Sequence, residues 1–382
     1  MCSEDYLRHF LLGQHARWQG HQKREMFNKI NNLRSYIFIL LACVALTSGC
    51  IKVKTGKQTA TLLATTEATH AQLMSEVNRF AGVSSMKAQM DLKFEDNSFA
   101  QFGSKEVYRA ADGEVVVQRP ASILLTVKIP VIKTDVAQMT SDGEKFRVAI
   151  LQDGGSGKYK KFVIGTNNAD YSKLQKDLDA SNGDKGTAIK QNVNAFANLR
   201  PQHFTDAMLV RPTDESHVYT HSTIFQLELD ETHSKSSPLR QVNRGYYLLD
   251  EFAKLADGEL RVTRRFWFDR VGGIRLARQQ IFDAKGEIES DIVYGLEGNL
   301  TDTGQYNRLP LQIIVTRPQE KYSMKLTYQV PEAVKIGEKY RDAAFVLQNT
   351  WELEEVDLDK KLQEVTAQKP VSTNTKTATR FQ

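Results

Sequence analysis

Apolar and polar residues alternate with a period of two along most of this chain. In residues 86–94, Met86, Ala88 and Met90 alternate with charged or amide side chains, which is typical of a strand with one buried and one solvent-facing side. The same alternation, or a short β-branched run, predicts strands at residues 99–108, 114–118, 123–129, 136–140, 146–150, 162–164, 218–229, 246–252, 260–268, 274–282, 288–296, 312–316 and 324–328. More than ten strands are therefore expected.

Short turn signals separate these strands, among them SDG at 141–143, ADG at 256–258, VGG at 271–273 and AKG at 284–286. Strands this close in sequence pair antiparallel, because parallel neighbours need a longer crossover. A continuous sheet of this size tends to curl and to enclose one face. The sequence thus predicts a mainly β fold: a large, strongly curved antiparallel sheet, or half-open barrel, with a few helices closing its concave face.

The helices are predicted from apolar residues at three- and four-residue steps. Ala71, Met74, Val77 and Phe80 follow this spacing from residue 67 onward, and Gly82 marks the end. A second helix is expected at 189–198 and a short third one at 201–209, beginning at Pro201. We expect the helix at 189–198 to be a mobile cover over the concave face.

Residues 26–50 have the pattern of an export signal that ends in a lipid-acceptor cysteine. Lys29 and Arg34 precede an apolar run at 36–46, which is shorter than the roughly 18 residues that a membrane-spanning helix needs. The sequence LTSGC at 46–50 resembles a bacterial lipobox, and this resemblance implies that Cys50 becomes the lipidated first residue after cleavage. The alternative is an uncleaved membrane anchor.

Composition divides the rest of the chain. We expect residues 1–25 to be a gene-start artefact or a disordered extension, 26–49 to be the signal peptide, and 50–66 to be a flexible tether rich in Lys and Thr. Residues 67–357 form the predicted domain, and residues 358–382 are expected to be a disordered tail.

Charge and cysteine content exclude several function classes. The chain has 51 basic and 46 acidic residues, too even a balance for electrostatic binding of nucleic acid. Its three cysteines are Cys2, Cys43 and Cys50, so the part after Cys50 has no disulfide, thiol nucleophile or cysteine metal ligand. We expect no cofactor.

No sequence motif indicates catalysis. His217 and His221 lie in a predicted strand, where they would stand about 13 Å apart; two exposed histidines are a simpler interpretation than a zinc site or a hydrolase, since no third ligand is evident. The glycines at 154, 155 and 157 are followed by no phosphate-loop lysine and no helix. We expect neither catalytic nor metal-binding residues, and no enzyme.

The strands are rich in apolar side chains, including several methionines. Flexible thioethers suit an adaptable apolar surface, so we expect a ligand cavity lined by Met86, Met90, Leu92, Phe146, Phe266 and Phe268. The alternative is that these side chains simply fill a solid core. Alternation does not reveal which face of the sheet is concave.

Three stretches, SSMKAQMDLKF, RPASILLTVKIPVIKTDVAQMTSDGEKFRVAI and LRPQHFTDAML, together with the lipobox, resemble the LolA/LolB-like superfamily of bacterial lipoprotein-sorting proteins. The resemblance covers roughly residues 67–357 and implies a curved half-barrel whose apolar cavity holds acyl chains. It implies an envelope lipoprotein, anchored in the outer membrane through Cys50 and facing the periplasm, which binds lipid or lipoprotein acyl chains with a soluble carrier protein as a further partner. A non-transporting lipoprotein that acts as a docking or assembly protein is the alternative.

Overall fold

The computed structural model describes residues 59–96, 106–107, 111–130, 132–152, 157, 160–169, 171, 174, 200–301, 303 and 306–367. Two compact units divide the chain, Met1–Thr59 and Ala60–Gln382, and all but one of the described residues belong to the second. The signal peptide, Cys50 and the helix predicted at 189–198 lie outside the described residues. None of the described helices is long and apolar enough to cross a membrane.

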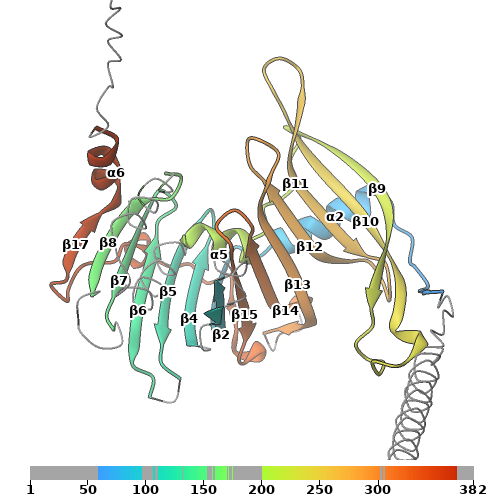
Figure 1. The fold of residues 1–382 in the computed structure, drawn as a ribbon, viewed down its shortest axis with the longest axis horizontal. Coiled ribbons are helices and arrows are strands. Elements are labelled where there is room, and N and C mark those ends of the chain that lie inside the picture. Colours follow the sequence, from blue (N-terminus) through green and yellow to red (C-terminus); the bar gives the residue numbers. More distant parts are fainter. Residues whose placement is uncertain are drawn as a thin grey trace, which may run out of the picture. The chain divides into compact units, whose positions relative to one another are not determined.

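The second unit is built on one open sheet (Figure 1), in which seventeen strands can be counted among the described residues. From edge to edge its main strands are β9 (His217–Leu229), β10 (Gln241–Lys254), β11 (Leu260–Asp269), β12 (Arg275–Phe282), β13 (Ile288–Leu300), β14 (Tyr306–Arg317), β15 (Tyr322–Tyr328), β2 (Ser85–Asp96), β4 (Ala111–Gln118), β5 (Ser122–Lys128), β6 (Asp135–Ser141), β7 (Lys145–Ile150), β8 (Lys161–Thr166) and β17 (Glu354–Asp357). The predicted mainly β fold with a large, curved sheet is confirmed.

Strand β2 joins two meanders. It pairs antiparallel with β4 on one side and with β15 on the other, so Met90 lies between Gly113 and Tyr328. The meander β4–β8 therefore continues through β2 into the meander β9–β15. Two short strands pair with the ends of β2: β3 (Glu106–Val107) beside β4, and β16 (Lys335–Ile336) beside β15.

The predicted hairpin turns are present. Gly258 and Gly286 have φ angles of 87° and 79°, a conformation that glycine adopts without the steric cost of a Cβ atom. At the turn between β6 and β7, the Asp142 carboxylate accepts hydrogen bonds from the backbone N–H groups of Glu144 and Lys145, at 3.0 and 2.8 Å.

Three predictions need correction. The sheet is not wholly antiparallel, because β1 (Thr61–Leu62) runs parallel to β10 and β17 runs parallel to β8. The expected tether is ordered from β1 onward, since the Leu63 N–H donates to the Asn243 carbonyl at 3.1 Å. The expected disordered tail begins with helix α6 (Leu358–Ala367), because the Asp359 carboxylate accepts a 2.8 Å hydrogen bond from the Thr166 hydroxyl on β8.

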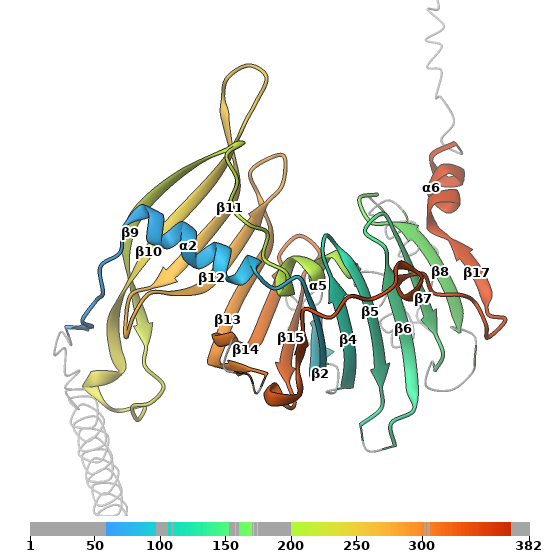
Figure 2. The same ribbon diagram turned by 180° about the vertical axis from the view of Figure 1, so that it is seen from behind.

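Helices α2 (His70–Ala81) and α5 (Pro201–Met208) lie over the same face of the sheet (Figure 2), which we call the inner face. Helix α2 begins at a capping box, in which Thr69 and Gln72 satisfy each other's backbone N–H groups. It buries Leu73, Val77 and Phe80, whereas Ala71, expected on the apolar side, is exposed. Helix α5 begins with Pro201 as predicted and packs on β4, β5, β6 and β14. In the described part of the chain, the short 3₁₀ helices η2 (Pro238–Arg240), η3 (Pro331–Ala333) and η4 (Asp342–Phe345) lie between strands.

Candidate functional site

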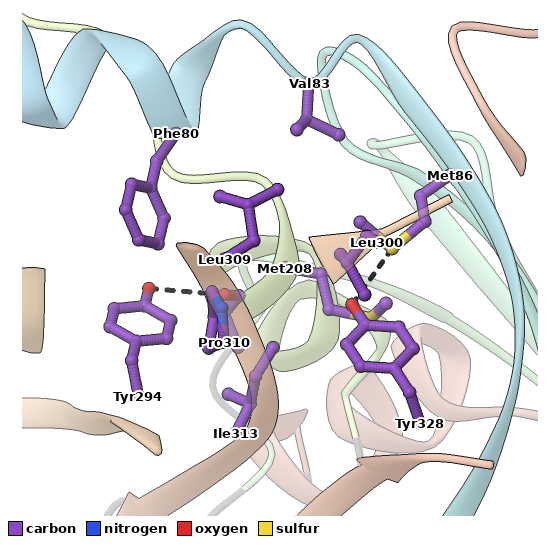
Figure 3. A pocket seen from close by; sticks show the side chains of 11 residues that line it. Phe80, Val83, Met86, Met208, Tyr294, Leu300, Leu309, Pro310, Ile313 and Tyr328 are labelled. Atoms are coloured by element: carbon purple, nitrogen blue, oxygen red, sulfur yellow. Dashed lines mark hydrogen bonds between the residues drawn. The ribbon is translucent and has the colours of Figure 1, made fainter. Parts of the chain in front are cut away.

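The inner face and its two helices form one apolar cluster with a small cavity inside it. The cavity measures about 20 Å³ (Figure 3) and is lined by Phe80, Val83, Met86, Ala207, Met208, Tyr294, Leu300, Leu309, Pro310, Ile313 and Tyr328. A cavity of this size holds about one water molecule, whereas small-molecule pockets usually have at least roughly 300 Å³. Around this cavity, the described side chains therefore leave little free volume.

Two tyrosines place their only polar atoms at the border of this cavity. The Tyr294 hydroxyl donates to the Ala207 carbonyl on α5 at 3.2 Å, and the Tyr328 hydroxyl lies 2.9 Å from the Met86 sulfur (Figure 3). Burial raises the pKa of both phenols above the ordinary value, so both are neutral donors. The cavity thus presents apolar surface with few polar groups.

All six residues expected to line a ligand cavity belong to the inner-face cluster. Met90, Phe146, Phe266 and Phe268 are at most 2% exposed, and Leu92 packs against them partly buried. Of the six, Met86 lines the cavity that the described residues form. The structure therefore shows which face of the sheet is the inner one, a choice that the alternation did not decide. The other five of the six predicted residues lie on this face but do not line the described cavity.

Arg119, the first residue of the stretch RPASILL, contacts the ends of both α2 and α5. Its guanidinium donates to the carbonyls of Val83, Leu209 and Val210, at 2.8, 3.4 and 2.7 Å. Val83 follows α2, and Leu209 and Val210 follow α5, so one side chain on the sheet binds the ends of both helices. Burial lowers the pKa of this guanidinium from its ordinary value. An arginine before a proline at a strand end was the available signal, but it does not reveal the partners.

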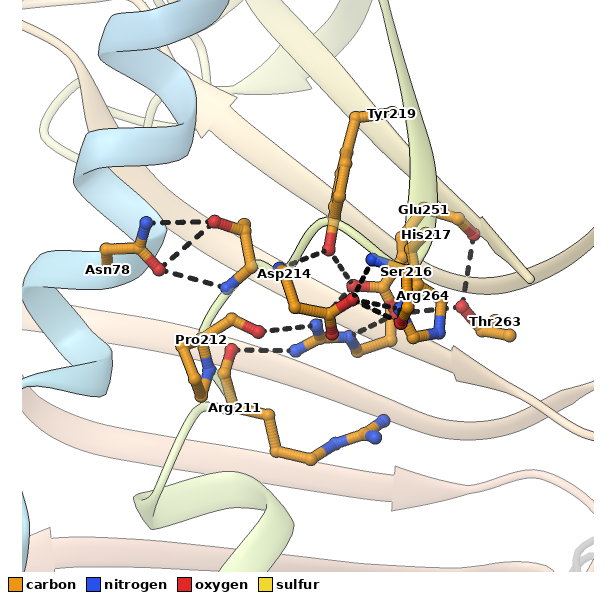
Figure 4. A network of polar contacts seen from close by, with 11 residues as sticks. Asn78, Arg211, Pro212, Asp214, Ser216, His217, Tyr219, Glu251, Thr263 and Arg264 are labelled. Carbon is orange, nitrogen blue, oxygen red and sulfur yellow. Dashed lines mark hydrogen bonds and ion pairs between the residues drawn. The ribbon is translucent and has the colours of Figure 1, made fainter. Parts of the chain in front are cut away.

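A second arginine binds the next two backbone carbonyls after Val210. Arg264, on β11, donates to the carbonyls of Arg211 and Pro212 at 2.8 and 3.1 Å (Figure 4). Two arginines of the sheet thus bind four consecutive carbonyls, at residues 209–212. This stretch, which we call the connector, is the start of the chain between α5 and β9.

Arg264 also forms a buried ion pair with Glu251 on β10. Both residues are 1% exposed, and the guanidinium Nε donates to the carboxylate at 2.8 Å. Burial opposes ionisation of Glu251, but the Arg264 guanidinium, with hydrogen bonds from Thr263 and Tyr219 at 2.8 Å each, holds its pKa below the ordinary value. A charged residue on the apolar side of a predicted strand was the only sequence signal for this pair.

Helix α2 is attached to the rest of the unit through its exposed side as well. Asn78 exchanges hydrogen bonds with Thr213, just after the connector, at 2.8 and 2.9 Å (Figure 4). Arg79 donates to the carbonyls of Asn307 and Arg308 on β14, at 2.9 and 3.2 Å. Helix α2 is therefore held mainly by side-chain hydrogen bonds near its C-terminal end and by apolar contacts along its length.

Helix α5 carries two polar side chains into this apolar region. The His203 ring contacts the Tyr322 hydroxyl, and burial, together with the charges of Arg317 and Arg200, holds its pKa well below the ordinary value. Burial raises the pKa of the Asp206 carboxyl to about 6, against the opposing effect of Arg211. Deprotonation of Asp206 at neutral pH therefore opposes the packing of α5.

The two histidines considered for metal binding lie apart on β9 and have different partners. His217 Nδ1 lies 2.8 Å from the Asp214 carboxylate, while His221 Nδ1 lies 3.2 Å from His70 Nδ1 on α2. Hydrogen bonds from Ser216 and His217 lower the pKa of Asp214 to about 2. Within the described ranges, no three His, Cys, Asp or Glu side chains gather as metal ligands would.

Comparison with known proteins gives likenesses in structure only. No protein-family model matches the sequence, and no curated protein matches it significantly. A LolA superfamily protein from Nitrosomonas europaea is 10% identical with a TM-score of 0.35, over 73% of this chain and 99% of that one. A DUF1329 family protein from Desulfovibrio piger is 10% identical with a TM-score of 0.36, over 72% and 95%.

A third solved structure, a domain described as an outer membrane lipoprotein-sorting protein, comes from Vibrio parahaemolyticus. It is 12% identical with a TM-score of 0.36, over 72% of this chain and 94% of that one. The protein from Nitrosomonas europaea is described as a member of the LolA superfamily, which the sequence resembles.

Proposed function

We propose that this chain is a membrane-anchored envelope lipoprotein that binds acyl chains between its inner face and the helices α2 and α5, in lipoprotein sorting or lipid transfer. The observation that supports this most directly is the apolar cavity between the two helices and the sheet. The proposal is a binding function and includes no catalytic step. Its anchor would be the lipidated Cys50, in the outer membrane facing the periplasm, with a soluble carrier protein as a partner.

An acyl chain would enter by displacing the cover. Phe80 and Met208 separate the cavity from the two helix backbones, and each is at most 6% exposed. Each methylene that replaces such contacts contributes about 0.8 kcal/mol of burial, so a chain of ordinary length compensates for the contacts that the helices lose. The described surface around the cavity has the required chemistry, because Ile313, Leu300 and Leu309 meet the ligand with carbon atoms alone.

The arginine contacts define what opening would require. Arg119 binds the ends of both helices, so lifting either helix breaks some of its three hydrogen bonds. Each such bond from a charged donor contributes roughly 1.5–3 kcal/mol. The closed state is therefore stable without ligand, and an acyl chain must supply the free energy that opens it, as binding coupled to a conformational change requires.

Lipid binding is tested with the folded protein and a matched pair of variants. We expect the wild type to carry co-purified lipid in native mass spectrometry and to bind a fluorescent fatty acid with a stoichiometry of one to a few. Ile313→Asp places a charge in the cavity and is expected to abolish binding, because an unpaired buried charge is costly. Val293→Asp is the control, since Val293 is 39% exposed and its neighbour Tyr294 lines the cavity.

Circular dichroism and thermal unfolding must show that both variants are folded. Equal binding by Ile313→Asp and Val293→Asp would place the ligand outside the cavity. A wild type that binds no lipid at micromolar concentration, and carries none from expression, would contradict the proposal.

The small size of the cavity favours a second candidate function. Because the cavity among the described residues has room for about one water molecule, the unit also suits a lipoprotein that does not transport lipid but docks or assembles with another protein. The same experiment separates the two functions, since a docking protein binds no fatty acid and carries no lipid from expression.

A further inference from the structure

Four large apolar side chains are exposed together at one edge of the sheet. Leu62, Phe225, Leu227 and Leu229 are 64%, 55%, 60% and 59% exposed, and we call them the apolar edge patch. Single exposed apolar residues are ordinary on protein surfaces, but a contiguous group marks a binding surface. These four belong to β1 and to the last half of β9.

Strand register places the four side chains on one face. Leu227 lies opposite Asn243 on one side of β10, and Leu62 lies opposite Asn243 on the other. Residues opposite each other in a sheet point to the same side, and Phe225 and Leu229 are two positions from Leu227. Phe225 lies over Gly245, where an added Cβ would come within 3.1 Å of its ring. The patch therefore lies on one face of the sheet, with Asn243 of β10 between Leu62 and Leu227.

The patch continues the inner face beyond the helix that covers it. Tyr247 and Leu249, further along β10 on the same side as Asn243, are buried in the inner-face cluster. Helix α2 begins at His70, beside His221, and Phe225 lies four positions past His221 on β9. In Figures 1 and 2, β1 lies beside the β9–β10 end of the sheet and α2 runs away from it. Among the described residues, α2 does not cover the sheet face here, and Thr65, which precedes α2, covers Gly245.

The chain segment before β1 indicates what covers the apolar edge patch. Cys50 precedes Ala60 by ten residues, and ten residues span at most about 35 Å when fully extended. A lipid attached to Cys50 would therefore keep Leu62, which is twelve residues after Cys50, within about 43 Å of the bilayer. The residues between Cys50 and Leu62 include Lys52, Lys54 and Lys57, and none of residues 50–66 is acidic. Such a segment is attracted to anionic lipid head groups.

We infer that the apolar edge patch inserts into the surface of the bilayer that holds the Cys50 anchor, and thereby orients the open end of the inner face toward the lipid. This inference rests on the proposed lipid anchoring. Anchor and patch are two separate attachments, one covalent and one formed by side chains. Ligand acyl chains would pass between the bilayer and the inner face at this edge without crossing water.

The test uses the absence of other thiols after Cys50. Leu227→Cys, in the lipidated mature protein that begins at Cys50, is labelled with an environment-sensitive fluorophore and bound to vesicles of phosphatidylcholine and anionic phosphatidylglycerol that contain a spin-labelled lipid. The matched control is Leu260→Cys, since Leu260 is 50% exposed and lies at the opposite end of the β10–β11 pair, across from Lys254. Flotation of the vesicles reports anchoring independently.

We expect both labelled proteins to float with the vesicles. The fluorescence at position 227 should rise roughly threefold on binding, because the probe leaves water for an apolar phase, and the spin label should quench it. Neither change is expected at position 260. If the protein floats but the label at position 227 shows neither the fluorescence rise nor the quenching, the inference is wrong, while the lipid anchor at Cys50 is supported. If the protein does not float, the anchor is refuted and the inference with it.

Two further outcomes would assign the patch to another occupant. A fluorescence rise at position 227 that occurs without vesicles and grows with protein concentration would mean that a second copy covers the patch. A rise on vesicles that the spin-labelled lipid does not quench would mean that a protein segment covers it, for example by pairing with the edge strand β9. Either result overturns the inference.

Discussion

Removal of the Arg264 side chain is expected to be among the most destabilising single changes in this chain. Arg264→Met removes the partner of Glu251 and the donors of the Arg211 and Pro212 carbonyls. Breaking a buried ion pair by deleting one partner costs about 3–5 kcal/mol, since the remaining charge stays buried. Because domains are stable by only about 5–15 kcal/mol, this is a large part of the total free energy of unfolding.

Arg265 provides a control one position away. It pairs with Asp250, but its side chain is 34% exposed, and an exposed ion pair contributes at most about 1 kcal/mol. Urea unfolding followed by circular dichroism should therefore show a midpoint lowered much more by Arg264→Met than by Arg265→Met. Hydrogen exchange should rise at residues 209–214 in the Arg264 variant, because the connector loses two of its four arginine contacts.

The pH dependence gives a second readout. In the wild type the pKa of Glu251 is lowered, so its pairing contributes stability above the ordinary carboxyl pKa and loses it as the pH falls through the lowered value. Without Arg264, burial alone raises the pKa of Glu251, and protonation then relieves the buried charge. The deficit of Arg264→Met should shrink between pH 7 and pH 5. Equal costs for the two arginine variants at pH 7 would refute the reasoning.

Two further predictions concern Asp206 and Cys50. Since the pKa of Asp206 is raised to about 6, its ionisation destabilises the fold at pH 7 by at most about 3 kcal/mol; Asp206→Asn should stabilise the protein at pH 7, and the gain should vanish as the pH falls toward 4. A gain in thermal unfolding that does not depend on pH would contradict this. Cys50→Ala should abolish acylation and leave a precursor that retains the signal peptide, as measured by mass spectrometry of the purified protein, and a lipidated peptide from this variant would contradict the assignment.

Local pattern was sufficient to predict most strands and their order along the chain. Alternation at Met86, Ala88 and Met90 is a property of each strand, and the hairpins at Gly258 and Gly286 depend on a few adjacent residues. A two-residue period requires only that one side of the strand be buried, whichever side that is. Neighbouring strands and tight turns can therefore be predicted from the sequence without any knowledge of distant contacts.

Tertiary structure decided what those strands enclose and what holds the cover. The place of β2 between β4 and β15 joins segments more than 200 residues apart, and β1 and β17 are too short to show a period. The sequence does not distinguish Arg119 and Arg264 from other arginines, because the partners of Arg119 and two of the partners of Arg264 are backbone carbonyls, which every residue has. Met86 lines the cavity, whereas Met90 does not. The two residues occupy equivalent positions in the alternating pattern of β2, so only the position of α5 and of the neighbouring strands distinguishes them.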